Sequence, residues 1–373
     1  MFKILSKCKD IELKGEKIFH FEIGDPDFNT PFEIVNSAIK SLQSGRTHYE
    51  SSCGNSAFIN RAREVTLISR QFMPNFDQLL VTPGANYQIF LALACTCNPG
   101  DEVLIPDPGF VSYKSVCKFL NLTPIYYPLK ESNRFEICCT DIIPLVSPKT
   151  KAIIINSPSN PTGAVSSEEE ITHLFDYCRH FNKWLISDEI YARLIYSNSK
   201  VHFSPSSLDH CNERVILING FSKAYAMTGW RVGIVTAPSY LTEKMRLLLE
   251  TSLSCVPPFI QDAACSALSI DPKIWQGMVN VYEKRRNLLV SGLSSLKHFR
   301  VSQPQGAFYV FPNIEETGFN DVQLASLLLE ECRIAVTPGR FFGPSGKNHL
   351  RFSFCCSTSD INIALNLLHA KLG

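Results

Sequence analysis

Short apolar runs recur along the first two thirds of the chain and set the expected architecture. Several are continuously apolar, as in residues 153–155 and 215–218, which is typical of strands buried on both faces of a sheet. The stretches between the runs are long enough for crossover helices. This alternation predicts an α/β fold with a central, mostly parallel sheet of seven strands. The predicted strands are residues 78–82, 102–106, 124–127, 152–156, 184–187, 215–219 and 232–236.

The pattern changes after about Pro257. A long helical region, residues 260–296, is followed by strand-like segments at 307–311 and 349–354. These features predict a smaller α+β domain, which we expect the first thirty or so residues to join. The predicted division is a large domain of residues 32–258 and a small domain formed by both chain ends, residues 1–31 and 259–373.

Composition narrows the class of protein. The chain has 373 residues, of which 45% are hydrophobic and 19% charged, as expected for a globular protein with more than one core. The net charge is +1 without a long run of either sign, which argues against nucleic acid or a membrane surface as the main partner. The first residues show no apolar signal segment, so we expect a cytoplasmic protein.

The chain carries 14 cysteines. Zinc sites favour paired C-x-x-C spacings, and the sequence has none. It offers adjacent or near-adjacent pairs instead, such as Cys138-Cys139, whose side chains would point to opposite faces of a strand. We therefore expect buried thiols in a reducing compartment and no metal site. Their number has no functional explanation in the sequence.

Polar residues follow three successive predicted strands where each strand ends. In an open parallel sheet, ligands bind beyond the carboxyl ends of the strands, so we expect these side chains to gather at one edge. They are Asn160 after the first strand, Asp188 and Tyr191 after the second, and Ser222, Lys223 and Arg231 after the third.

This set of side chains suits pyridoxal 5'-phosphate (PLP). The cofactor needs an amine for its aldehyde, a carboxylate for its pyridinium nitrogen, a partner for its ring hydroxyl and donors for its phosphate. A lysine in a dry pocket with cationic neighbours has a lowered pKa, which makes it a usable nucleophile and base. The residues alone thus favour a PLP site with Lys223 as its amine.

Motifs in the same order along the chain resemble those of the class I/II aminotransferases, the fold-type I PLP enzymes related to aspartate aminotransferase. The resemblance extends over nearly the whole chain. It implies a large PLP-binding domain, a small second domain and a homodimer with shared active sites. The matching stretches are residues 24–31, 157–163, 187–191, 222–233, 305–309 and 350–354.

The resemblance also implies roles around the cofactor ring. Lys223 would hold PLP as a Schiff base and later carry the proton between the substrate Cα and the cofactor. Asp188 would pair with the pyridinium nitrogen, while Asn160 and Tyr191 would bind the ring hydroxyl oxygen. Phe110 matches the position of an aromatic ring that stacks on the cofactor.

Further positions match the family's phosphate site. Ser222 and Arg231 would bind the phosphate together with backbone N–H groups at a helix start. Tyr49 matches a tyrosine that reaches the phosphate of the neighbouring subunit. The expected N–H donors belong to Gly84, Ala85 and Asn86.

Three positions bear on the substrate. Arg351 matches the arginine that grips the substrate α-carboxylate, with Asn160 beside it, and Gly24 lies in the family's substrate loop.

The chain departs from the family pattern in two ways. Only about twenty residues precede the substrate loop, which puts the usual dimer contacts in doubt, and Arg340 stands where relatives often carry a small residue. We advance the hypothesis that Arg340 faces the pocket and selects an acidic or polar substrate.

The predicted reaction is ping-pong transfer of an amino group from an L-amino acid to a 2-oxo acid through the Lys223 Schiff base. A PLP-dependent β-lyase of the same fold stays open, because the same lysine, aspartate and arginine would serve it. A non-enzymatic regulator or scaffold of the fold is a further alternative, although the retained Lys223, Asp188 and Arg351 argue for catalysis. The sequence does not specify the donor, the acceptor or the pathway.

Overall fold

The computed structural model describes residues 2–197 and 201–373. Its main feature is a seven-stranded sheet with the order β2-β8-β7-β6-β5-β3-β4. β8 is antiparallel to both of its neighbours, and all other neighbouring pairs are parallel. The predicted α/β class is confirmed. The strands are β2 (Leu79–Thr82), β3 (Glu102–Asp107), β4 (Thr123–Pro128), β5 (Thr150–Asn156), β6 (Trp184–Asp188), β7 (Val215–Gly220) and β8 (Gly233–Thr236).

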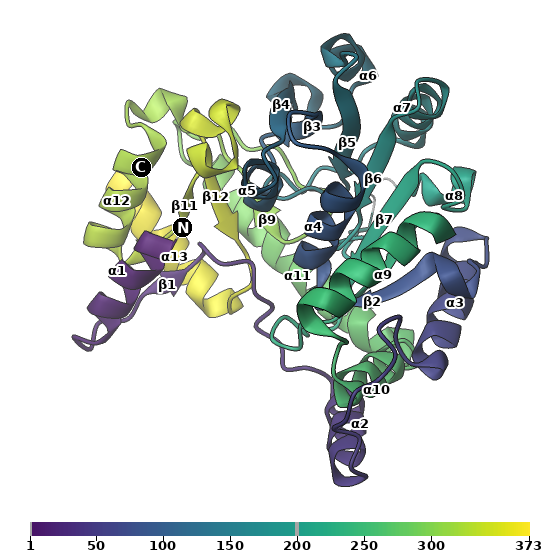
Figure 1. The fold of residues 1–373 in the computed structure, drawn as a ribbon. Helices are drawn as coiled ribbons and strands as arrows, with labels where there is room; N and C mark the ends of the chain where they lie inside the picture. The colour runs from purple at the N-terminus through teal and green to yellow at the C-terminus, as the bar shows by residue number, and fades with distance from the viewer. Residues whose placement is uncertain (1, 198–200) are drawn as a thin grey trace.

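The central strands contain continuous apolar runs because helices cover both faces of the sheet (Figure 1). On β5, Ile153 and Ile155 pack in one cluster with Leu174 of α7, whereas Ile154 packs on the other face with Leu91 of α4. Side chains alternate along a strand, so both sets must be apolar. The helices of this part are α3 (Ser56–Arg70), α4 (Ala85–Thr96), α5 (Val111–Phe119), α6 (Cys139–Ile142), α7 (Glu168–His180), α8 (Ser206–Asp209) and α9 (Ser239–Leu253).

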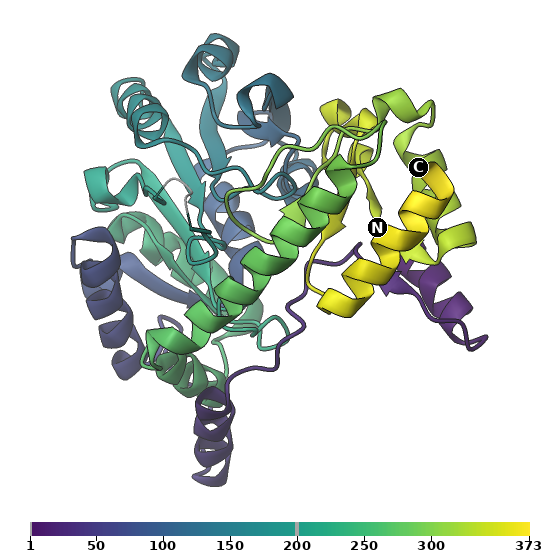
Figure 2. The same ribbon diagram turned by 180° about the vertical axis from the view of Figure 1, so that it is seen from behind.

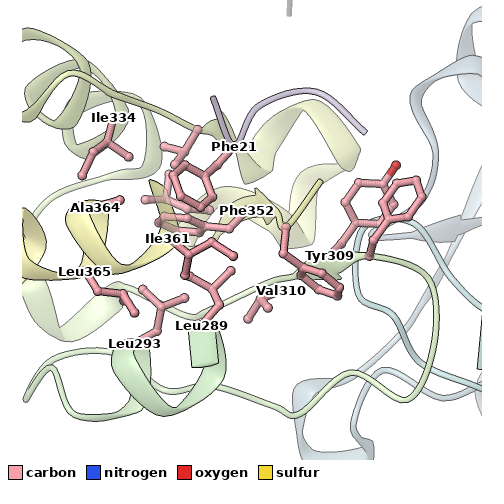
Figure 3. Close-up of a cluster of buried hydrophobic side chains, with 14 of the residues drawn as sticks. Phe21, Leu289, Leu293, Tyr309, Val310, Ile334, Phe352, Ile361, Ala364 and Leu365 are labelled. Atoms are coloured by element: carbon pink, nitrogen blue, oxygen red, sulfur yellow. The ribbon is translucent and has the colours of Figure 1, made fainter. Parts of the chain in front are cut away.

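The two ends of the chain lie together beside the large sheet, as both views show (Figures 1 and 2). β1 near the N-terminus pairs in parallel with β10, and β9, β11 and β12 form a three-stranded sheet. Figure 3 shows their shared core, in which the rings of Phe21 and Phe352 pack edge to face and Ile334 belongs to the same cluster. The elements are α1 (Phe2–Glu12), β1 (Phe19–His20), β9 (Tyr309–Val310), α12 (Asp321–Cys332), β10 (Ile334–Ala335), β11 (Thr337–Pro338), β12 (Leu350–Ser353) and α13 (Thr358–Leu372).

The predicted long helical region is in fact two helices, α10 (Pro258–Ala267) and α11 (Pro272–Ser294). The break has a local cause, because Asp271 is the N-cap of α11 and its side chain accepts from the N–H of Lys273, with Pro272 at the first helical position. In Figure 2, α11 runs diagonally between the large-sheet part and the elements formed by the chain ends. The boundaries proposed at residues 32 and 258 stay a prediction.

α2 (Phe32–Gln43) extends from the body of the molecule and packs on α10 (Figure 1). No helix within the described ranges is both long and apolar enough for a membrane span. Short 3-10 helices complete the structure: η1 (Phe76–Gln78), η2 (Glu131–Asn133), η3 (Ile143–Leu145), η4 (Glu315–Thr317), η5 (Gly339–Phe342) and η6 (Pro344–Asn348).

Candidate active site

The carboxyl ends of β5, β6 and β7 bring the predicted polar residues to one edge of the sheet. Asn156 at the end of β5 stands opposite Asp188 at the end of β6, and Asp188 stands opposite Ile218 of β7. The side chain of Asn156 ties this edge together. It donates to the carbonyl of Asp188 at 2.9 Å and accepts from the N–H of Asn160 at 2.8 Å.

Asp188 presents a buried carboxylate. Asp188 is 3% exposed, and burial raises the pKa of its carboxyl group to about 6. The hydroxyl of Tyr113 donates to Oδ2 at 2.6 Å and the N–H of Ile190 to Oδ1 at 3.3 Å, which partly offsets the cost of burial. No cation of the described chain forms an ion pair with it. A cationic ligand group would therefore be strongly favoured here.

Lys223 presents an amine with a lowered pKa. Nζ donates to the carbonyl of Gly24 at 2.5 Å and lies 5.5 Å from the ring centre of Phe308. Burial, helped by the positive charges of Arg351 and Arg231, lowers the pKa of Lys223 to about 8. An amine in this state is unprotonated in a useful fraction near neutral pH.

Arg231 and Gly84 form a cradle suited to an anion. A Cβ added to Gly84 would lie only 2.6 Å from Nη2 of Arg231, so the guanidinium lies directly against the glycine. Gly84 has φ +83° and is the N-cap of α4. The first N–H groups of a helix have no partner within it, and they carry partial positive charge. The expected donors Ala85 and Asn86 occupy this first turn, where phosphate groups bind in many proteins.

Arg351 on β12 forms a second anion site. It is 3% exposed, and its guanidinium donates to Oδ1 of Asn160 at 3.0 Å and to the carbonyl of Glu22 at 2.6 Å. The group lies between the rings of Tyr309 and Phe342, 4.5 and 4.8 Å from their centres. Its Nε is buried and has no hydrogen-bond partner among the described residues. A buried donor without a partner is costly, so this site favours a ligand carboxylate.

Two tyrosines of the site were not assigned from the sequence. Tyr113 bonds Asp188 and follows Phe110, whose ring packs edge-on against it at 5.6 Å. Tyr309 shares a 2.8 Å hydroxyl–hydroxyl hydrogen bond with Tyr191, and both residues are buried. The matching stretch 305–309 contained the signal for Tyr309, whereas the sequence does not show that Tyr113 reaches a carboxylate 75 residues away.

The remaining predicted residues occupy contrasting positions. Ser222 is buried next to Lys223 in the chain, at 7% exposure. Tyr49 is 88% exposed and lies on the surface. The contact made by Arg340 argues against the hypothesis that this residue faces the pocket and selects the substrate. Its Nε donates to Oδ1 of Asp321 at 2.8 Å, and this fully buried carboxylate at the start of α12 neutralises the guanidinium.

Comparison with known proteins agrees with this geometry. The chain is 35% identical to "Aromatic-amino-acid aminotransferase 2" of Thermococcus litoralis, over 99% of this chain and 95% of that protein. It is 36% identical to "Aspartate aminotransferase" of Pyrococcus abyssi, with the same coverage of both proteins.

Solved structures give the same result. An aromatic aminotransferase from Pyrococcus horikoshii superposes with a TM-score of 0.92 and 34% identity, over 97% of this chain and 98% of that one. An alanine aminotransferase from Pyrococcus furiosus has a TM-score of 0.94 and 28% identity, covering 99% and 96%. The family described as "Aminotransferase class I and II" matches residues 16–368. The chain therefore belongs to the class I and II aminotransferases, as its motifs predicted, and is an enzyme of that family.

Proposed function

We propose that the protein moves an amino group from an L-amino acid to a 2-oxo acid in a ping-pong reaction, with PLP held at Lys223. The observation that carries the proposal is the lowered pKa of Lys223 between two arginines. Its buried amine has a pKa near 8, and two guanidinium groups, those of Arg231 and Arg351, lie close enough to lower it. The guanidinium of Arg231 suits a phosphate, and that of Arg351 suits a substrate carboxylate.

The site residues fit PLP. The carboxylate of Asp188 would hold the ring nitrogen, and the side chains of Asn160 and Tyr191 would meet the ring hydroxyl. Arg231, with Ser222 and the first turn of α4, would hold the phosphate. When bound, the cofactor supplies a conjugated ring that accepts electron density as a bond to the substrate Cα breaks.

The protein's own groups would position the substrate and move the proton. Arg351 would bind the α-carboxylate through the guanidinium edge that has the unpaired Nε. Since Arg351 also contacts Asn160, the carboxylate and the cofactor would share one rigid frame. Lys223 Nζ would accept the Cα proton, because burial keeps its amine a usable base. The Gly24 carbonyl holds that nitrogen in place.

A homodimer with shared active sites is part of the proposal. Tyr49 is 88% exposed and Phe32, at the start of α2, is 74% exposed. Large aromatic side chains left in water near a protruding helix are typical of a surface that another chain covers. A second copy would bury both rings and bring Tyr49 to the neighbouring phosphate site.

Single-turnover spectroscopy tests the proposed reaction. The PLP-loaded protein is mixed with a panel of L-amino acids without any 2-oxo acid. We expect the absorbance of the bound cofactor to change once per site, with one equivalent of the matching 2-oxo acid released and the change reversed by adding a 2-oxo acid. Continuous release of ammonia and pyruvate would instead identify a β-lyase. Absence of a cofactor band after addition of PLP would reject Lys223 as its ligand.

Gly84→Ala tests the anion cradle. A methyl group would lie 2.6 Å from Arg231 Nη2, so we expect PLP affinity to fall at least about 10-fold, which corresponds to about 1.4 kcal/mol. Gly100→Ala is the matched control, because Gly100 has a similar φ of +90° but no neighbour within 4 Å of the added methyl group. Fluorescence titration with PLP measures both. Equal affinities in the two variants would contradict the assignment.

Asp188→Asn tests the buried carboxylate in cofactor-free protein. The pKa of Asp188 is raised from 3.8 to about 6, so the folded state binds a proton more readily than the unfolded state. Proton binding by Asp188 therefore stabilises the folded wild-type protein below pH 4, and this stabilisation is lost as the pH rises through 6. We expect the variant to match wild type near pH 4 and to exceed it by up to about 3 kcal/mol at pH 8. Urea unfolding measures this difference.

The control for Asp188→Asn is Asp176→Asn, at an exposed position of α7. It should show no comparable gain at pH 8. A stability difference between the Asp188 variant and wild type that did not change with pH would show that this carboxylate is not the source.

Arg351→Lys tests the substrate site. Lysine keeps the charge but loses the planar fork, so we expect kcat/KM for amino donors to fall roughly 100-fold, which is about 3 kcal/mol of transition-state stabilisation. Arg340→Lys is the control, and we expect its kcat/KM to stay within about twofold of wild type because Arg340 pairs with Asp321. Equal losses in both variants would reassign the carboxylate site. Steady-state kinetics with acidic and neutral donors gives both values.

A further inference from the structure

Three potential metal ligands meet between α1 and β1, outside the candidate active site. Cys8 of α1, His20 of β1 and Glu22 just after it each place one ligand atom so that all three lie within 4.8 Å of one another. Side chains alternate along an extended segment. His20 and Glu22 therefore share one side, while Phe19 and Phe21 point into the core shown in Figure 3.

Glu22 carries an independent sign of a missing ligand. The residue is fully buried, and its Oε1 lies 2.8 Å from Nδ1 of His20. Its other oxygen, Oε2, is buried without any hydrogen-bond partner in the part of the chain that the structure describes. A buried carboxylate oxygen left without a partner is costly. A cation between Glu22 and Cys8, which is 1% exposed, would remove this cost.

Glu12 prepares the imidazole for such a cation. Its Oε1 lies 3.0 Å from Nε2 of His20. Without an ion, Nδ1 donates to Glu22 and Nε2 donates to Glu12, and these carboxylates raise the pKa of His20. A cation bound at Nδ1 would displace the Nδ1 proton and leave the Nε2 proton shared with Glu12. Histidines that bind metals generally donate their other ring N–H to a carboxylate or carbonyl in this way, which sets the tautomer and orients the ring.

We propose that this cluster binds Zn²⁺ through Cys8 Sγ, His20 Nδ1 and the Glu22 carboxylate. The thiolate and the carboxylate together neutralise the charge of the ion, which suits a site with two buried ligands. The ion replaces the thiol proton of Cys8 and any proton on Nδ1, and both leave to solvent. A thiolate with an imidazole selects zinc over magnesium or calcium, which take oxygen ligands.

The geometry needs only a small adjustment. Zinc–ligand bonds of about 2.0–2.3 Å place tetrahedral ligands roughly 3.5 Å apart. Separations near the 4.8 Å limit of the cluster would shorten by about 1 Å, and the 2.8 Å between His20 Nδ1 and Glu22 Oε1 would lengthen. The side chain of His20 is 39% exposed, which leaves room for water as the fourth ligand. No sequence motif marks the site, because its ligands come from separate elements and form no C-x-x-C pair.

The ion would fasten α1 to the segment that supports the substrate site. The carbonyl of Glu22 accepts from Arg351 at 2.6 Å, so one residue contributes its side chain to the cation and its backbone to the arginine. Substitution of Glu22 would disturb both sites. Cys8 and Glu12 are therefore the informative positions, since neither contacts the candidate active site.

Zinc binding by the full-length PLP-loaded protein tests the proposal. After treatment with a chelator, wild type should take up about one Zn²⁺ per chain in equilibrium dialysis, and Co²⁺ should give a thiolate-to-metal charge-transfer band. Cys8→Ser should lose both signals. Cys332→Ser, a buried cysteine on α12 of the same region, should keep both. The absorbance of bound PLP confirms that each variant is folded. It cancels when the spectrum without Co²⁺ is subtracted from the spectrum with Co²⁺.

Glu12→Gln provides a milder second variant at a half-exposed position. It should retain the charge-transfer band and lower zinc affinity by about 10-fold, as loss of a group that orients a ligand does. Zinc should also raise the melting temperature of wild type but not of Cys8→Ser. The proposal is overturned if wild type takes up no zinc, or if Cys8→Ser binds zinc and is stabilised by it as well as wild type.

Discussion

Two ionisable groups, Asp188 and Lys223, are buried at one edge of the mostly parallel sheet, and their burial sets the electrostatics of the candidate active site. Removing a charge from water is expensive, so the Asp188 carboxyl has a raised pKa and the Lys223 amine a lowered one. Asp188 ends β6, whereas Lys223 lies in the turn after β7, where its Nζ donates to the carbonyl of Gly24. A ligand with a cationic nitrogen and a carbonyl group would relieve both costs together.

The second constraint is that the site is assembled from both ends of the chain. Arg351 on β12 contacts Asn160 after β5 and the carbonyl of Glu22 near the N-terminus, 191 and 329 residues away. The pairing of β1 with β10 and the core around Phe21 bring these segments together. The anion site therefore depends on the docking of the N-terminal segment as much as on its own strand.

The N-terminal segment has a double role in this arrangement. It supplies the carbonyl of Gly24 to Lys223 and the carbonyl of Glu22 to Arg351. Its side chains at His20 and Glu22 face α1 and form the proposed cation site. This backbone segment accepts hydrogen bonds from two cationic side chains of the candidate site, and a metal ion bound on its other side would make the segment more rigid.

The sequence by itself determined the strands, because two-sided burial leaves continuous apolar runs, and it determined which polar residues follow those strands. Family motifs added Arg351 and suggested roles for Lys223 and Asp188. Only the tertiary structure decided which side chains meet: the bond between Tyr113 and Asp188, the pairing of Arg340 with Asp321, and the cluster around Glu22. Periodicity and caps are local signals spaced by a few residues. Contacts between side chains from distant segments depend on how whole elements pack, and no local pattern encodes that.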